Sequence, residues 1–159
     1  MLLDLKGLFS ASLPKIALDC LIDLDENPIK SPVRVSGEFV SRPASVFLSC
    51  ALDYVLAANC DRCAEYFENP GRLLIEQTIV TEPANEDADF IVCENQELDL
   101  TELVRSEIIL NLPPKLLCRE DCKGVCPGCG ANLNREECAC ARSETDPRLE
   151  KLRLLLKKE

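Results

Sequence analysis

Six cysteines lie between residues 118 and 140, at spacings that restrict how this part of the chain can fold. They read Cys118-x3-Cys122-x3-Cys126-x2-Cys129-x8-Cys138-x-Cys140. A further pair, Cys60-x2-Cys63, stands far upstream, and the chain contains no histidine. Two thiolates on one tight turn are typical of a zinc knuckle, and glycines such as Gly128 and Gly130 let backbone amides turn toward the sulfurs. The spacing therefore predicts structural metal sites, and the favoured metal is zinc.

A disulfide scaffold is the alternative for a chain with 11 cysteines, but three features oppose it. The count is odd, and the Cys-x2-Cys spacings are those of metal ligands. The first nine residues lack a basic start and include Asp4, which makes them a poor signal peptide. No apolar run reaches the length that spans a membrane. We therefore expect a cytoplasmic protein with reduced thiols and no membrane partner.

The eight paired or nearly paired cysteines allow two sites of four ligands each. In the preferred partition, Cys60 and Cys63 join Cys118 and Cys122 and hold the tail against the strand-rich part of the chain. The other four then close a local site, and they are Cys126, Cys129, Cys138 and Cys140. In the competing partition, the two Cys-x2-Cys knuckles combine as in a zinc ribbon. Spacing does not decide between them, and four thiolates also accept iron.

The three isolated cysteines, Cys20, Cys50 and Cys93, stand in apolar or strand-like contexts where cysteine packs as a small hydrophobic side chain.

The sequence favours closed structural metal sites over a catalytic one. A catalytic zinc leaves one position open for water and usually has a histidine ligand, and this chain contains no histidine. No catalytic residue is predicted. The alternative is a thiol-disulfide redox enzyme or an RNA-processing enzyme that uses the cysteine pairs. In a thioredoxin-like enzyme the Cys-x2-Cys pair lies at the N-terminus of a helix, which lowers the thiol pKa, whereas Cys60-x2-Cys63 is followed by a predicted strand.

Hydrophobic periodicity predicts a strand-rich body. A two-residue alternation runs over residues 33–39 and again over residues 46–56, with a turn signal at Arg42-Pro43-Ala44 between them. Residues 72–80 and 90–93 have the composition of further strands, and the acidic stretch 81–89 is expected to be a surface loop. These segments predict an α+β fold whose sheet is antiparallel and either open or barrel-like.

Two helices are expected. Asp99 is an N-cap for a helix over residues 100–110, which Pro113-Pro114 ends, and Asp146-Pro147 begins a short amphipathic helix that closes the chain. The prolines mark a boundary between a body, residues 1–114, and a cysteine-rich tail, residues 115–159. Because the tail has few large apolar groups before its terminal helix, metal binding must supply its folding energy.

The net charge of −10 is unevenly distributed. Residues 1–114 contain 20 acidic and 8 basic side chains, a net charge of −12, whereas residues 115–159 contain 8 acidic and 10 basic ones, a net charge of +2. The acidic body argues against a large nucleic-acid groove and suits a basic protein partner. Four basic side chains of the tail are candidates for phosphate contacts, and they are Arg119, Lys123, Arg135 and Arg142.

The order of these features resembles the YceD family, the bacterial large ribosomal RNA subunit accumulation proteins. The resemblance is specific in the cysteine run after Pro113-Pro114 and in Asp146-Pro147-Arg148-Leu149, and it is weak before Val33. It implies a non-catalytic factor that promotes accumulation of 23S ribosomal RNA during assembly of the large subunit. The implied partner is a ribosomal precursor, either a basic ribosomal protein or the 23S ribosomal RNA itself. The resemblance does not settle the oligomeric state.

Overall fold

The computed structural model describes residues 1–24, 26–82, 90–138 and 140. The predicted C-terminal helix, its Asp146-Pro147 start, Arg142 and most of the predicted loop 81–89 lie outside these residues. The chain forms two compact units. The first contains Met1–Ala58 and Tyr66–Leu116, and the second contains Asn59–Glu65 and Leu117–Glu159.

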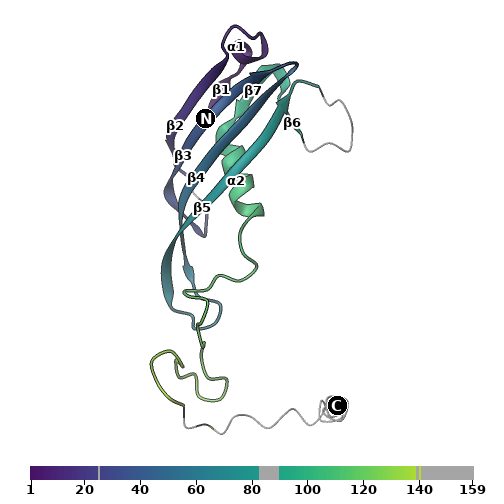
Figure 1. Ribbon diagram of the computed structural model, residues 1–159. Helices are drawn as coiled ribbons and strands as arrows, with labels where there is room; N and C mark the ends of the chain where they lie inside the picture. Colours follow the sequence, from purple (N-terminus) through teal and green to yellow (C-terminus); the bar gives the residue numbers. More distant parts are fainter. Residues whose placement is uncertain (25, 83–89, 139, 141–159) are drawn as a thin grey trace, which may run out of the picture. The chain divides into compact units, whose positions relative to one another are not determined.

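A five-stranded sheet is the main element of the first unit (Figure 1). Its strands are β2 (Lys15–Ile22), β3 (Ile29–Arg42), β4 (Ser45–Asn59), β5 (Tyr66–Val80) and β6 (Phe90–Val92), and they lie side by side in that order. The sheet is open, with β2 and β6 at its edges, so the barrel-like alternative is wrong for the described residues. The sheet is also mixed, because β6 pairs with β5 in parallel.

The antiparallel pairing expected for the two alternating segments is confirmed, and they form a hairpin. β3 and β4 pair in antiparallel register from Ile29 opposite Leu56 to Arg42 opposite Ser45. Ala44 in the turn has a φ of 58°, the left-handed conformation that several classes of tight turn require at one position. Gly37 lies opposite Cys50, where an added Cβ would come within 2.2 Å of the Ser49 carbonyl oxygen, so the close approach of the two backbones there requires glycine.

One face of the sheet is covered by α2 (Leu100–Leu110), as Figure 1 shows. The helix spans the predicted residues, and the Asp99 carboxylate caps it by accepting hydrogen bonds from the amides of Thr101 and Glu102. Leu100, Val104 and Ile108 are buried on its sheet-facing side. They share one core cluster with strand residues that include Val33, Val35, Phe39, Leu48 and Leu52 of the alternating pattern and Ile79 of β5.

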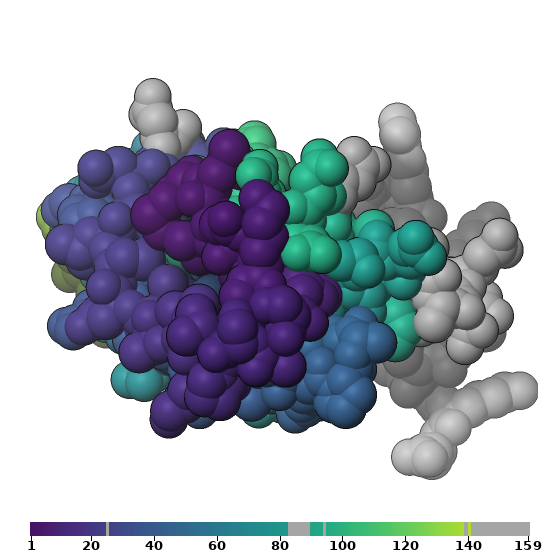
Figure 2. All heavy atoms as spheres, turned by 90° about the horizontal axis from the view of Figure 1, so that it is seen from above, coloured from purple at the N-terminus to yellow at the C-terminus, as the bar shows by residue number. Residues whose placement is uncertain are grey.

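The N-terminal residues complete the first unit. β1 (Leu2–Asp4) pairs with β7 (Glu97–Asp99) in a separate two-stranded sheet, and α1 (Lys6–Phe9) follows β1. Figure 2 shows these purple residues beside the green residues near α2, and the Leu100 amide donates a hydrogen bond to the Met1 carbonyl at 3.0 Å. A single-turn 3-10 helix, Glu94–Gln96, links β6 to β7.

The three isolated cysteines pack as predicted. Cys50 and Cys93 belong to the core cluster, and Cys20 is partly buried against it. Burial, together with smaller contributions from Glu107 and Cys20, raises the pKa of the Cys50 thiol to about 11. These cysteines are apolar packing groups that stay protonated at neutral pH.

Candidate metal centres

The structure brings eight cysteines into two groups of four. In each group the four cysteine sulfurs all lie within 4.8 Å of one another. The first cluster is Cys60, Cys63, Cys118 and Cys122, and the second cluster is Cys126, Cys129, Cys138 and Cys140. This is the partition that the sequence analysis preferred, and the zinc-ribbon combination of the two knuckles is not formed. That these sulfurs bind a metal is a prediction to be tested.

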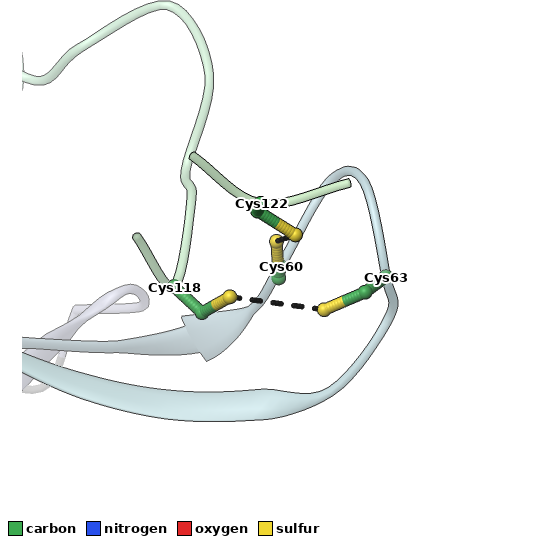
Figure 3. Close-up of side chains that lie close together, drawn as sticks. All are labelled: Cys60, Cys63, Cys118 and Cys122. Carbon is green, nitrogen blue, oxygen red and sulfur yellow. Dashed lines mark hydrogen bonds between the residues drawn. The ribbon is translucent and has the colours of Figure 1, made fainter. Parts of the chain in front are cut away.

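The first cluster joins two parts of the chain that are distant in sequence. Cys60 and Cys63 lie on the turn between β4 and β5, and Cys118 and Cys122 follow α2. Figure 3 shows the four side chains pointing toward one another. The sulfurs of Cys60 and Cys122 are 3.8 Å apart, as are those of Cys63 and Cys118. Cys60, Cys63 and Cys122 are buried.

The two knuckles have the same backbone turn. The Ala64 amide donates to the Cys60 carbonyl at 2.8 Å, and the Gly130 amide donates to the Cys126 carbonyl at 2.8 Å. Ala64 has a φ of 58° and Gly130 a φ of 76°. The residue after the second cysteine must therefore adopt the left-handed conformation, which glycine accepts at least cost. In the second knuckle the Gly128 amide also donates to the Cys126 sulfur, as the glycine content predicts.

The second cluster is local and more exposed. The Cys138 sulfur lies 3.2 Å from that of Cys126 and 3.4 Å from that of Cys129. The Cys140 amide donates to the Cys138 sulfur at 3.2 Å. Cys129 and Cys140 are exposed to solvent. The second cluster is thus the more accessible one to water and chelators.

Arg62 connects the first knuckle to the tail. Its guanidinium donates to the carbonyls of Cys122 at 2.8 Å and Glu120 at 3.2 Å, and its own carbonyl accepts from the Val125 amide at 3.0 Å. Gly124, with a φ of 77°, passes close to this carbonyl, and a Cβ there would lie 2.9 Å from it. Sequence reasoning missed this role, because an arginine between two cysteines shows no periodicity or spacing signal.

Thiol ionisation in both clusters is uneven. Burial raises the pKa of Cys60, but hydrogen bonds from backbone amides outweigh it and lower that pKa to about 6. In the second cluster, hydrogen bonds led by the Cys129 amide lower the pKa of Cys126 to about 6. The pKa of Cys118 is raised to about 12, first by burial and then by its three neighbouring sulfurs. Hence the sulfurs of a cluster do not all ionise at neutral pH without a cation among them.

The donor set fits zinc. With a Zn–S distance of about 2.3 Å, the sulfurs of a tetrahedral four-cysteine site lie about 3.8 Å apart. In the first cluster, the Cys60–Cys122 and Cys63–Cys118 separations, both 3.8 Å, match that edge, whereas the separations of 3.2 and 3.4 Å in the second cluster are shorter. They are far longer than a disulfide bond of about 2.05 Å. Residues of this kind hold a metal in a closed shell, and a bound zinc would supply the charge that lets all four thiols ionise.

The difference in exposure predicts the order of metal loss. We expect a chelator in moderate excess to remove one ion rapidly from the second cluster and a second ion slowly from the first, because Cys129 and Cys140 are open to attack. The measurement is alkylation of each cysteine during chelation, read by peptide mass spectrometry. Labelling of Cys60 or Cys122 before Cys129 would contradict this order.

The tail cations proposed for phosphate contacts are partly engaged within the protein. Arg119 contacts Asp121 at 3.3 Å and the Asn134 side chain at 2.8 Å, and Arg135 forms a 2.6 Å ion pair with Glu65. Lys123 is exposed, and Arg142 lies outside the described residues. In the part of the chain that the structure describes, no helix is long and apolar enough to cross a membrane.

Comparison with known proteins identifies relatives. The chain is 28% identical over 156 residues to the chloroplastic large ribosomal RNA subunit accumulation protein YCED homolog 1 of Arabidopsis thaliana, covering 78% of this chain and 48% of the relative. The Zea mays protein of the same name is 27% identical over 144 residues, covering 70% and 49%. YlbN of Bacillus subtilis (strain 168) is 26% identical over 132 residues, covering 81% and 77%.

The chain thus spans about half the length of the two plant relatives. No solved structure matches it. The family model described as "Large ribosomal RNA subunit accumulation protein YceD" matches residues 48–156, a range that contains all eight clustered cysteines. The chain therefore belongs to the YceD family, whose name points to a role in accumulation of the large-subunit ribosomal RNA.

Proposed function

We propose that this protein is a non-catalytic factor in large ribosomal subunit biogenesis, which promotes accumulation of 23S ribosomal RNA by binding a ribosomal precursor. Family membership carries the biological role. The non-catalytic reading is supported by the two four-cysteine clusters, because four thiolate ligands fill a tetrahedral zinc shell and leave no position for a reacting water.

The proposed metal sites are structural and use the eight clustered cysteines. Metal binding would hold the second unit together, because the buried apolar side chains among its described residues are all candidate ligands: Cys60, Cys63, Cys122 and Cys126. Structural zinc substitutes for a hydrophobic core in small modules of this kind. Metal analysis of protein purified under reducing conditions distinguishes zinc from iron, which four-cysteine sites also accept.

For the partner we favour a basic ribosomal protein over direct RNA contact. Residues 1–114 carry a net charge of −12, which attracts cations and repels phosphate. In the second unit, the ion pairs of Arg119 and Arg135 reduce the positive charge available to RNA. The 23S ribosomal RNA is the alternative partner, and the salt dependence of binding separates the two.

The test combines a cellular and a binding measurement. Deleting the gene should lower the ratio of 23S to 16S ribosomal RNA, and the unaltered protein should restore it. Purified protein should bind large-subunit precursors with a shallow salt dependence, because few phosphates are neutralised. A steep salt slope would indicate RNA contact. An unchanged ribosomal RNA ratio would contradict the proposed function, and reactive thiols without metal would favour the thiol-disulfide enzyme instead.

A further inference from the structure

Asn134 links the two cysteine clusters. It lies in the loop between Cys129 and Cys138, two residues of the second cluster. Its side-chain nitrogen nevertheless donates a hydrogen bond to the sulfur of Cys122, in the first cluster, at 3.3 Å. A residue held by the loop of one cluster thus contacts a candidate ligand of the other.

Its neighbours fix the orientation of the Asn134 amide. The Arg119 guanidinium and the Lys123 backbone amide both lie 2.8 Å from Oδ1, and both groups can only donate. The atom they contact is therefore oxygen, and the NH₂ group faces Cys122. The same NH₂ group donates to the Asn132 Oδ1 at 2.9 Å, so both side-chain donors and both acceptor positions of Asn134 are used.

The position of Asn134 depends on the fold of its loop. The Asn134 amide donates to the Asn132 side chain at 3.0 Å, and the Leu133 amide donates to the Gly124 carbonyl at 2.9 Å. The two ends of the loop are Cys129 and Cys138, whose sulfurs lie 3.4 Å apart. A metal in the second cluster would fix both ends and so hold Asn134 against Cys122.

We propose that Asn134 is a positioning residue that couples the two metal sites, so that metal in the second cluster raises the metal affinity of the first. An amide that donates to a ligand sulfur stabilises its thiolate form, which is the form that binds metal. Coupling between sites is reciprocal, so metal in the first cluster strengthens the second by the same factor. This inference rests on the proposed metal binding. Outer-shell partners of this kind typically change metal affinity about 10- to 100-fold.

A double-mutant cycle tests the coupling. The four full-length proteins are the unaltered chain, Asn134→Ala, Cys126→Ser with Cys129→Ser, and the combination of all three substitutions. Each is held in a zinc and chelator buffer, and alkylation of Cys60 and Cys122 is measured by peptide mass spectrometry. We expect the loss of the second cluster to weaken the first about 10-fold or more when Asn134 is present, and hardly at all when it is replaced.

Two further variants separate coupling from loop stability. Asn134→Asp keeps an acceptor for Arg119 and Lys123 but sets a carboxylate against the Cys122 sulfur, so it should weaken the first cluster more than Asn134→Ala does. Glu137→Gln changes an exposed side chain in the same loop and should leave both clusters unaltered. If Asn134 only stabilised the loop, Asn134→Asp would retain more metal than Asn134→Ala.

The outcomes are distinguishable within one experiment. Protection of the buried Cys50 and Cys93 reports that the first unit is folded in every variant. Equal effects of the cluster deletion with and without Asn134 would overturn the coupling but leave metal binding intact. Absence of any zinc-dependent protection in the unaltered chain would overturn the proposed metal sites, and the coupling with them.

Discussion

Replacing Cys60 and Cys63 together by serine is expected to reduce the bound metal from two ions per chain to one, measured at saturating zinc. The remaining ion belongs to the second cluster, whose four sulfurs come from residues 126–140 alone. The same change should free the segment around Cys118 and Cys122, because their partners on the β4–β5 turn no longer bind. Limited proteolysis after residue 116 reports that release.

The size of this effect follows from what else holds the segment. Arg62 contributes two hydrogen bonds to carbonyls, worth about 1.5–3 kcal/mol each for a charged donor. The ion pair between Arg135 and Glu65 is largely exposed and adds about 0–1 kcal/mol. A structural zinc supplies about 10–16 kcal/mol of apparent binding free energy in small peptides. Metal binding is therefore expected to be the largest contribution to keeping this segment folded.

Cys20→Ser is the matched control for the double substitution. It makes the same chemical change at a partly buried cysteine that belongs to neither cluster. Two ions per chain should be retained in this variant. Two ions in the Cys60→Ser, Cys63→Ser protein, with unchanged proteolysis, would contradict the assignment of these cysteines as ligands.

Local signals in the sequence predicted the elements whose determinants lie close together in the chain. The α2 helix begins after Asp99 and ends at Leu110 because the cap, the apolar spacing and the following prolines all fall within a few turns. The β3–β4 hairpin is equally local, since its turn joins Arg42 directly to Ser45. Alternation alone then indicated which side chains of the hairpin face the core.

Elements that depend on distant partners were missed. In β2, apolar residues occur on both faces, with Ala17 and Leu21 opposite to the buried Leu18 and Ile22, so no clean alternation identifies it. The parallel pairing of β6 with β5 has no local signature in three residues. Likewise, cysteine spacing left the partition of the clusters open, because only the fold brings Cys60 beside Cys122. Asn132-x-Asn134 carries the turn propensity of asparagine, but its contact with Cys122 is a tertiary feature.

Phe39→Ala is expected to lower the free energy of unfolding of the first unit by about 3–5 kcal/mol. Phe39 is 1% exposed and is among the largest fully buried side chains of the core. It lies on β3 opposite Leu48 and belongs to the core cluster that also contains buried residues of α2. Since domains of this size are stable by about 5–15 kcal/mol, the loss is a large share of the total. Urea unfolding of the metal-saturated protein, followed by circular dichroism, measures it.

Phe47→Ala provides the same substitution on the other face of the same hairpin. Phe47 precedes Leu48 on β4, so its side chain points away from the core cluster. Its ring packs under the Arg42 guanidinium at 3.8 Å, a contact worth about 0.5–1 kcal/mol at an exposed site. This substitution should therefore lower the free energy of unfolding much less than Phe39→Ala does. The slope of that free energy against urea concentration should stay the same. Equal losses at the two positions would mean that both faces of the sheet are buried, and the open face would then have to be covered in solution.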